Sequence, residues 1–152
     1  MAFILSTRSK NNLKGVHPSV VKVISEAVVD SPYDFVITSG VRTATQQNAL
    51  YQQGRNGNPG KRVTNADGYK NKSNHQPKSD GFGHAIDIAL CGVVIDGKYI
   101  KYKTGEEMYD SKKMKVVADH IKAIAKKLDI KIEWGGDWKG ELVDSPHYQL
   151  SK

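Results

Sequence analysis

An aspartate inside an apolar segment is the feature that most constrains how this chain can fold. Asp87 lies within residues 85–90, which are otherwise apolar and predict a buried strand. A buried carboxylate without a partner is costly, so the fold must bring it a cation, a metal ion or several hydrogen-bond donors. The sequence therefore requires compensating groups beside this strand.

The rest of the hydrophobic pattern predicts an α+β fold. Amphipathic periodicity indicates helices at residues 17–29, 43–53 and 106–129. Short strands are expected at residues 34–38, 85–90, 131–134 and 147–150, with a hairpin around Asp96-Gly97 in residues 93–100. Residues 55–83 form a long irregular stretch, which in a small domain is usually functional or mobile. We expect a small, mostly antiparallel sheet packed with about three helices.

Size and charge narrow the class of protein. The 152 residues, without repeats or a linker, predict a single domain over residues 1–152. A formal net charge of +7 favours an anionic partner. The lysines are scattered, and no recognition-helix or stacking pattern accompanies them, so nucleic acid is not the expected partner. No apolar run is long enough to cross a membrane, and the amino terminus lacks a secretory signal pattern.

The single cysteine, Cys91, excludes an intramolecular disulfide and fits synthesis in a reducing compartment. It follows an apolar run, so we expect a small buried hydrophobe and not a nucleophile.

Histidines and acids gather where loops meet the predicted strands. His75 and His84 precede Asp87, and Asp144 precedes His147 at the start of the last strand. Two imidazoles and one carboxylate can hold a catalytic zinc ion and leave a position open for water. Asp144 lies three residues before His147 across a proline turn, where it is placed to act as a general base.

Other interpretations of these residues remain open. Asp87 could accept backbone N–H groups, with His147 a plain strand-edge residue. A non-haem iron oxygenase also uses two histidines and one carboxylate, usually with a His-x-Asp pair in one strand. His84 and Asp87 are three positions apart, so in a strand they would point to opposite faces. That spacing weakens both the iron interpretation and His84 as a ligand partnered with Asp87.

The order of the motifs resembles a known family. The chain carries Ser73-Asn74-His75, then Gly83-His84-Ala85-Ile86-Asp87, then Asp144-Ser145-Pro146-His147. Further similar stretches are Ser39-Gly40-Val41-Arg42-Thr43 and Glu133-Trp134-Gly135-Gly136-Asp137-Trp138. Together they resemble the zinc D-alanyl-D-alanine carboxypeptidases and phage L-alanyl-D-glutamate endopeptidases, which share the Hedgehog/DD-peptidase-like zinc peptidase fold. The likeness covers essentially the whole chain.

The resemblance implies a role for each matched residue. His75, Asp87 and His147 would hold Zn²⁺, and Asp144 would be the general base. Arg42 would bind a substrate carboxylate or the developing oxyanion, a role that suits a guanidinium with paired charge-assisted hydrogen bonds. Ser73 would hydrogen-bond the substrate or a ligand.

One departure from the family pattern concerns the spacing of the first two ligands. Asp87 follows His75 by 12 positions, whereas the compact pattern has seven. The extra residues fall in the segment 76–82, and an insertion in a surface loop costs little chain entropy. The insertion leaves His84 as a rival to His75.

The resemblance implies a phage endolysin that hydrolyses the L-alanyl-D-glutamate bond of peptidoglycan stem peptides and so lyses the host cell. The expected partner is bacterial peptidoglycan, without nucleic acid or membrane insertion, and the expected state is a monomer. With no signal peptide and no wall-binding domain, the protein is expected to stay in the host cytoplasm until a separate protein opens the membrane. One alternative is a D-alanyl-D-alanine carboxypeptidase on the same scaffold. Another is a non-catalytic zinc-binding module of this fold, against which Asp144 argues.

Overall fold

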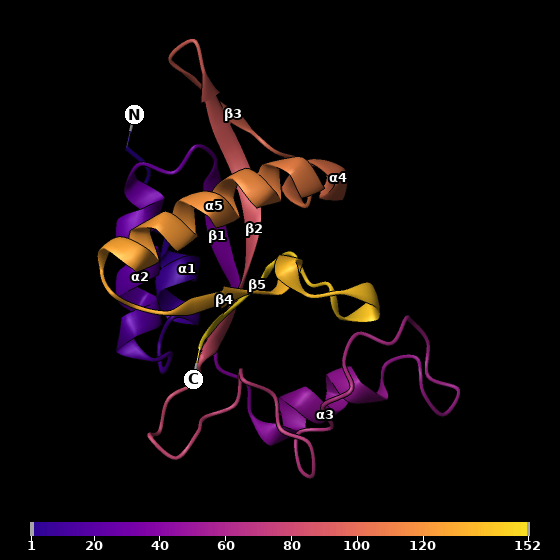
Figure 1. Cartoon of the computed structure of the whole chain (residues 1–152). Coiled ribbons are helices and arrows are strands. Elements are labelled where there is room, and N and C mark those ends of the chain that lie inside the picture. Colours follow the sequence, from indigo (N-terminus) through magenta and orange to yellow (C-terminus); the bar gives the residue numbers. More distant parts are fainter. Residues whose placement is uncertain (1, 152) are drawn as a thin grey trace.

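One antiparallel sheet forms the centre of the molecule (Figure 1). The structure, a computed structural model, describes residues 2–151 except for the side chain of Glu141. The strands lie in the order β1-β2-β5-β4, and β3 pairs with the far end of β2. Their bounds are β1 Asp34–Ser39, β2 Ala85–Ile95, β3 Lys98–Lys101, β4 Ile132–Trp134 and β5 His147–Leu150. The predicted α+β class is confirmed, and every strand pair is antiparallel among the residues described.

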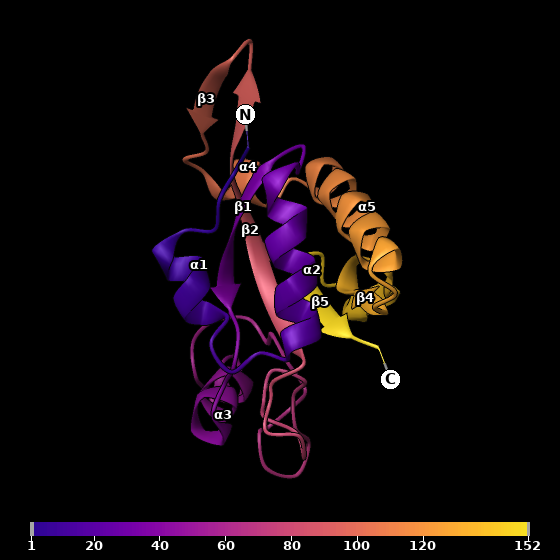
Figure 2. The same cartoon turned by 90° about the vertical axis from the view of Figure 1, so that its left-hand side faces the viewer.

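Two long helices cover one side of this sheet (Figure 2). Helices α2 (Pro18–Val29) and α5 (Ser111–Lys127) contact each other, and they also contact β5 and β4 respectively. The apolar side chains of both helices pack on the inward residues of the strands and form one core. Each apolar surface is removed from water only where it packs against another element. The largest side chains fully buried there are Tyr148, Phe35, Ile24, Ile37, Ile86, Ile88, Leu90, Met114 and Ile121.

The strand alternation places the polar residues of the sheet away from this core. Ile86 and Ile88 belong to the core cluster. Asp87 lies between them in β2, so its side chain points to the opposite face. The sheet therefore has an apolar face under α2 and α5 and a second face on which polar side chains can meet.

Helix α1 (Thr7–Asn12) was not expected from the sequence, and it protects the edge strand β1. The Ser9 hydroxyl accepts a hydrogen bond from the Ile37 amide at 2.9 Å, and the Asn12 side chain donates to the Ile37 carbonyl at 2.7 Å. An edge strand otherwise presents unpaired backbone groups to other chains. Two side chains of α1 thus replace the hydrogen bonds of a missing neighbouring strand.

The single helix expected at residues 106–129 is in fact two helices. The short α4 (Gly105–Met108) and the long α5 are separated at Tyr109 and Asp110. Asp110 leaves the helical conformation (φ −56°, ψ 122°), and its carboxylate accepts from the Lys113 amide at 3.0 Å. Asp110 is therefore an N-cap, and a cap begins a new helix because it satisfies backbone donors that have no partner in the preceding turn.

The remaining segments surround the polar face of the sheet. An arm of residues 40–83 contains helix α3 (Ala44–Gln52) and lies at the bottom of Figure 1. The connection from β4 to β5 contains two short 3₁₀ turns, η1 (Gly135–Asp137) and η2 (Gly140–Leu142). Among residues 2–151, no helix combines the length and the apolar character that crossing a bilayer requires.

Candidate metal centre

Three adjacent strands bring four polar side chains to one face of the sheet. Asp87 of β2 pairs directly with His147 of β5. Glu133 of β4 pairs with Gln149 of β5. His147 and Gln149 are two positions apart, so they share a face. The register of the sheet, and not local sequence, therefore creates this cluster.

His75 reaches the cluster from the arm. Its backbone carbonyl accepts from the Arg42 amide at 2.9 Å, and its amide donates to the Ser73 hydroxyl at 3.1 Å. Gly83 passes so close that a Cβ there would lie 2.9 Å from the His75 carbonyl oxygen. The His75 side chain is 3% exposed. These contacts fix the imidazole at the end of β2.

The facing atoms of His75, Asp87 and His147 form a compact set of ligands. All three ligand atoms lie within 4.8 Å of one another. The carboxylate oxygen Oδ1 of Asp87 is 3.5 Å from His75 Nε2 and 3.3 Å from His147 Nδ1. The side chains come from the arm, β2 and β5, so three separate segments converge on one point.

Hydrogen bonds on the far side of each ring suit a metal ion at this point. His75 Nδ1 lies 2.8 Å from the Gly40 carbonyl, and His147 Nε2 lies 2.8 Å from the Gln149 side-chain oxygen. Each outer nitrogen carries the proton in the tautomer that these acceptors select, so each inner nitrogen offers a lone pair. Two such nitrogens and one carboxylate are a suitable donor set for a divalent transition metal.

The charge of Asp87 is maintained despite its burial. Burial alone would raise its pKa. When no metal is bound, the imidazoles of His147 and His75 can also carry protons on their inner nitrogens and donate to the carboxylate, which holds the pKa of Asp87 well below its usual range. A metal ion would take the place of these inner protons. Arg42 adds an ion pair, with Nη2 3.0 Å from Asp87 Oδ2. The carboxylate is therefore ionised at neutral pH, as a metal ligand must be. The compensating groups that the sequence demanded are two imidazoles and a guanidinium.

Arg42 is oriented by two contacts at the margin of the cluster. Besides the ion pair with Asp87, its Nη1 donates to the Gln47 side-chain oxygen at 3.2 Å. Gln47 is fully buried, and its amide nitrogen donates to Thr64 Oγ1 at 3.2 Å and to the Ala66 carbonyl at 3.0 Å. Gln47 thus ties α3, the following loop and the guanidinium together.

Asp144 approaches the cluster from the loop that precedes β5. Its Oδ2 is 4.0 Å from His147 Nδ1, and 49% of its side chain is exposed. The turn is tight, since a Cβ on Gly135 would lie 2.2 Å from the Asp144 carbonyl oxygen. Partial burial and the nearby Asp87 carboxylate raise the pKa of Asp144 above its ordinary value. The group is accessible and more basic than a normal aspartate.

The structure separates His84 from this cluster. His84 Nε2 lies 2.6 Å from Asp80 Oδ2, in a different group of side chains. The geometry thus brings His75, and not its rival His84, to Asp87. Ser73 lies two residues before His75, and its hydroxyl accepts a hydrogen bond from the His75 amide. This is a local turn contact.

A chain of hydrogen bonds behind His147 was not identified from the sequence. Gln149 Oε1 faces His147 and also accepts from Asn74 Nδ2 at 2.9 Å. The Gln149 amide nitrogen donates to Glu133 Oε2 at 3.1 Å, and Trp138 Nε1 donates to Glu133 Oε1 at 2.7 Å. The signal available in the sequence was the two-residue spacing of His147 and Gln149 within one strand.

Comparison with known proteins places the chain in a family. A model of the family described as phage L-alanyl-D-glutamate peptidase matches residues 1–149. The chain belongs to the phage L-alanyl-D-glutamate peptidase family. The family predicted from the motifs is therefore confirmed, and the match extends along nearly the whole chain.

Individual proteins that the chain resembles support the same family assignment. The chain is 34% identical over 142 residues to the peptidoglycan L-alanyl-D-glutamate endopeptidase CwlK of Bacillus subtilis (strain 168), covering 89% of this chain and 73% of that one. It is 30% identical over 141 residues to the L-alanyl-D-glutamate peptidase of Escherichia phage T5, covering 91% and 83%. The crystal structure of the Serratia marcescens L-Ala D-Glu endopeptidase ChiX superposes with a TM-score of 0.68 at 27% identity, covering 99% and 91%.

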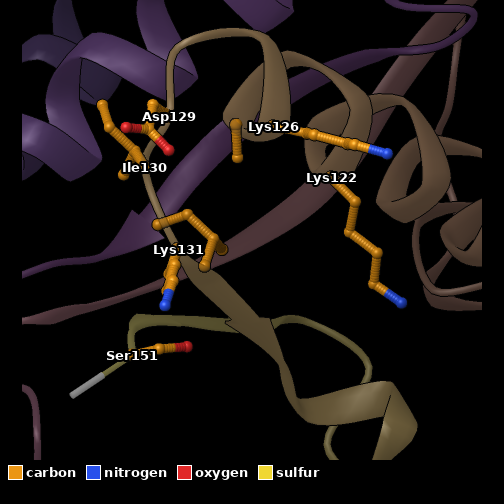
Figure 3. A pocket seen from close by; sticks show the side chains of 8 residues that line it. Lys122, Lys126, Asp129, Ile130, Lys131 and Ser151 are labelled. Atoms are coloured by element: carbon orange, nitrogen blue, oxygen red, sulfur yellow. The ribbon is translucent and has the colours of Figure 1, made fainter.

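Two other features of this family member are not part of the centre. A cavity of about 530 Å³ lies between the end of α5 and β4, lined by Lys122, Lys126, Lys131 and others (Figure 3). The lysine side chains point in different directions in this view, and the Lys122 amine already pairs with Asp137. Burial raises the pKa of Cys91 to about 12, so its thiol stays protonated and is not a nucleophile.

Proposed function

We propose that this chain is a zinc endopeptidase that hydrolyses the L-alanyl-D-glutamate bond of peptidoglycan stem peptides. The observation that carries the proposal is the convergence of two imidazole lone pairs and an ionised carboxylate within 4.8 Å. The family and its named relatives supply the substrate, since CwlK and the phage T5 enzyme are both named for this bond.

His75, Asp87 and His147 are the proposed zinc ligands. Zinc favours imidazole and carboxylate donors, and three protein ligands leave a position free for chemistry. Bound there, the metal would supply Lewis acidity, which polarises a carbonyl and acidifies water. The contacts of the two outer ring nitrogens with Gly40 and Gln149 would hold both imidazoles in the required tautomer.

Asp144 is the proposed general base. Its Oδ2 lies 4.0 Å from His147 Nδ1 and its side chain is half exposed, so it can reach a water molecule at the proposed centre. It takes a proton from the attacking water as the water oxygen bonds to the L-alanyl carbonyl carbon. It then gives that proton to the departing amine of D-glutamate as the C–N bond breaks. Asp144 is regenerated as a carboxylate, and the products are an L-alanyl carboxylic acid, which ionises in water, and a free D-glutamate amine.

Arg42 is the proposed anion-binding residue of the reaction. Its contacts with Asp87 and Gln47 engage one nitrogen each and fix the plane of the guanidinium. A guanidinium has five N–H donors, so others remain for a substrate carboxylate or the developing oxyanion. Ser73, whose hydroxyl hydrogen is not used in accepting the His75 amide, is proposed to donate to the substrate.

The wider setting is part of the proposal. We infer that the chain acts as one domain over residues 1–152, as a monomer, on the wall of a bacterial host. Synthesis in the host cytoplasm and release through a membrane lesion made by another protein would suit an endolysin, and the phage T5 relative supports this setting. The D-alanyl-D-alanine carboxypeptidase alternative would use the same metal and base, but the named relatives are L-alanyl-D-glutamate enzymes.

Zinc content and wall lysis, measured on the same dialysed samples, test the ligand set. We expect wild type to retain one tightly bound zinc and to lyse wall, and His75→Ala to lose both. His84→Ala is the matched control, because His84 faces Asp80 and not Asp87. It should keep the tight zinc and the activity. Tight zinc and full lysis in His75→Ala would contradict the proposed site.

A further inference from the structure

A second group of histidines and a carboxylate lies outside the proposed active site. His17, Asp80 and His84 also bring one potential ligand atom each within 4.8 Å of one another. Asp80 Oδ2 lies 2.6 Å from His84 Nε2 and 3.9 Å from His17 Nε2, and the two imidazole rings are 5.2 Å apart between centroids. The three residues come from the start of α2, the segment 76–82 and the approach to β2. Asp80 and His84 are four residues apart on one connection, so two segments distant in sequence converge here.

The carboxylate of Asp80 is aimed by its own turn. Its Oδ1 accepts from the Phe82 amide at 2.9 Å, which leaves Oδ2 directed at the two imidazoles. The Phe82 amide and the His84 side chain lower the pKa of Asp80, so this oxygen is charged at neutral pH. Side-chain exposures of 27% for His17, 39% for Asp80 and 18% for His84 leave the group open to an ion from solvent.

The two histidines differ in how readily they would bind a metal. Among the described residues, no hydrogen bond engages His84 Nδ1, so this nitrogen can take the proton while Nε2 binds. His17 Nδ1 instead accepts from the Ser19 amide at 3.1 Å as the cap of α2. Coordination through His17 Nε2 would move a proton to Nδ1 and break that cap. The group should therefore bind a metal more weakly than the cluster around Asp87.

We propose that His17, Asp80 and His84 form a second, weaker transition-metal site. Imidazole donors favour zinc, copper or nickel, whereas calcium requires six to eight oxygen ligands, which this group does not supply. An ion there would fasten the segment 76–82 to the start of α2 and to β2. The site is independent of the peptidase proposal, because it shares no residue with the ligand set of the active site.

Zinc titration of the metal-free full-length chain, followed by calorimetry at neutral pH, tests the second site. We expect wild type to bind two equivalents, one tightly and one weakly. His84→Ala and Asp80→Asn should each lose the weak equivalent and keep the tight one. His75→Ala should lose the tight equivalent and keep the weak one. Ser79→Ala is the matched control, an exposed change in the same segment, and should keep both.

A second measurement guards against misfolding of a variant. In His75→Ala, added zinc should shift the imidazole NMR signals of His17 and His84 and the amide signal of Ser19, whose hydrogen bond is broken. Saturation of wild type at one equivalent would overturn the proposal. The proposal would also be overturned if both His84→Ala and Asp80→Asn still bound two equivalents of zinc. Unchanged NMR signals of His17, His84 and Ser19 on addition of zinc would overturn it as well. A failure of the peptidase proposal can be told apart from this outcome, because it would show in the tightly bound zinc: wild type would lack it, or His75→Ala would keep it.

Discussion

At the scale of single residues, Gln149 shows how one side chain can determine the chemistry of another. An amide side chain can face either way, but Glu133 only accepts hydrogen bonds and therefore holds the amide nitrogen. The amide oxygen then faces His147, whose Nε2 carries the proton and whose Nδ1 turns its lone pair toward Asp87. Gln149 is thus a positioning residue for the proposed ligand His147.

Replacing Gln149 by leucine should weaken zinc binding. The change removes the acceptor that selects the tautomer of His147, and losses of such outer contacts typically lower metal affinity about 10–100-fold. Competition with a chelator measures the affinity directly. Gln149→Glu combined with Glu133→Gln keeps an acceptor oxygen at His147 and a donor within the pair, so this double variant should stay near the wild-type affinity. Equal affinities for Gln149→Leu and wild type would show that Gln149 does not orient His147.

Asp144 illustrates a residue whose proposed role opposes stability. Its pKa is raised in the folded state, so folding favours the protonated form and ionisation at neutral pH lowers the free energy of unfolding. This cost disappears as the pH falls below the pKa of the unfolded chain. Asp144→Asn removes the charge, so the melting temperature of the metal-free variant at neutral pH should equal or exceed that of the metal-free wild type. A clear fall in melting temperature would contradict the sign of this shift.

At the scale of elements, local patterns predicted the helices and strands better than their ends. The apolar stripe from Met114 onward correctly indicated α5. The apolar run of residues 85–90 correctly indicated a strand, although β2 continues to Ile95. The break at Asp110 was missed because the stripe was extended backward through a capping residue. The partnership of Gln149 with Glu133 depends on the pairing of β4 with β5, and a single sequence does not specify that register.

Gln47 is one of two buried amides, with Gln76, that hold the arm between β1 and β2 together. Gln47→Leu should lower the free energy of unfolding by about 1–3 kcal/mol, because its hydrogen-bond partners at Thr64 and Ala66 are left without it. Amides of the arm should also exchange faster with solvent. Thr45→Ala changes an exposed residue of the same helix and should be close to neutral. Hydrogen exchange measured for both variants checks the claim, and identical protection would refute it.

At the scale of the whole molecule, the sheet separates the hydrophobic core from the polar site. One face is buried under α2 and α5, and Asp87 and His147 pair on the other face. The arm with α3 lies at the bottom of Figure 1. The motifs predicted the three proposed ligands, of which Asp87 lies near the start of β2, His147 begins β5 and His75 lies in the arm. The supporting contacts of Gln47 and Gln149 come from the assembled fold and were not predicted.

Product analysis of purified muropeptides most directly tests the central claim. Mass spectrometry should show that the zinc-loaded wild type produces a peptide with a new D-glutamate amino terminus. Asp144→Asn, matched for zinc content, should be slower by about 10²–10⁴-fold, the usual contribution of a general base. Release of terminal D-alanine alone, or wild-type rates in Asp144→Asn, would contradict the account.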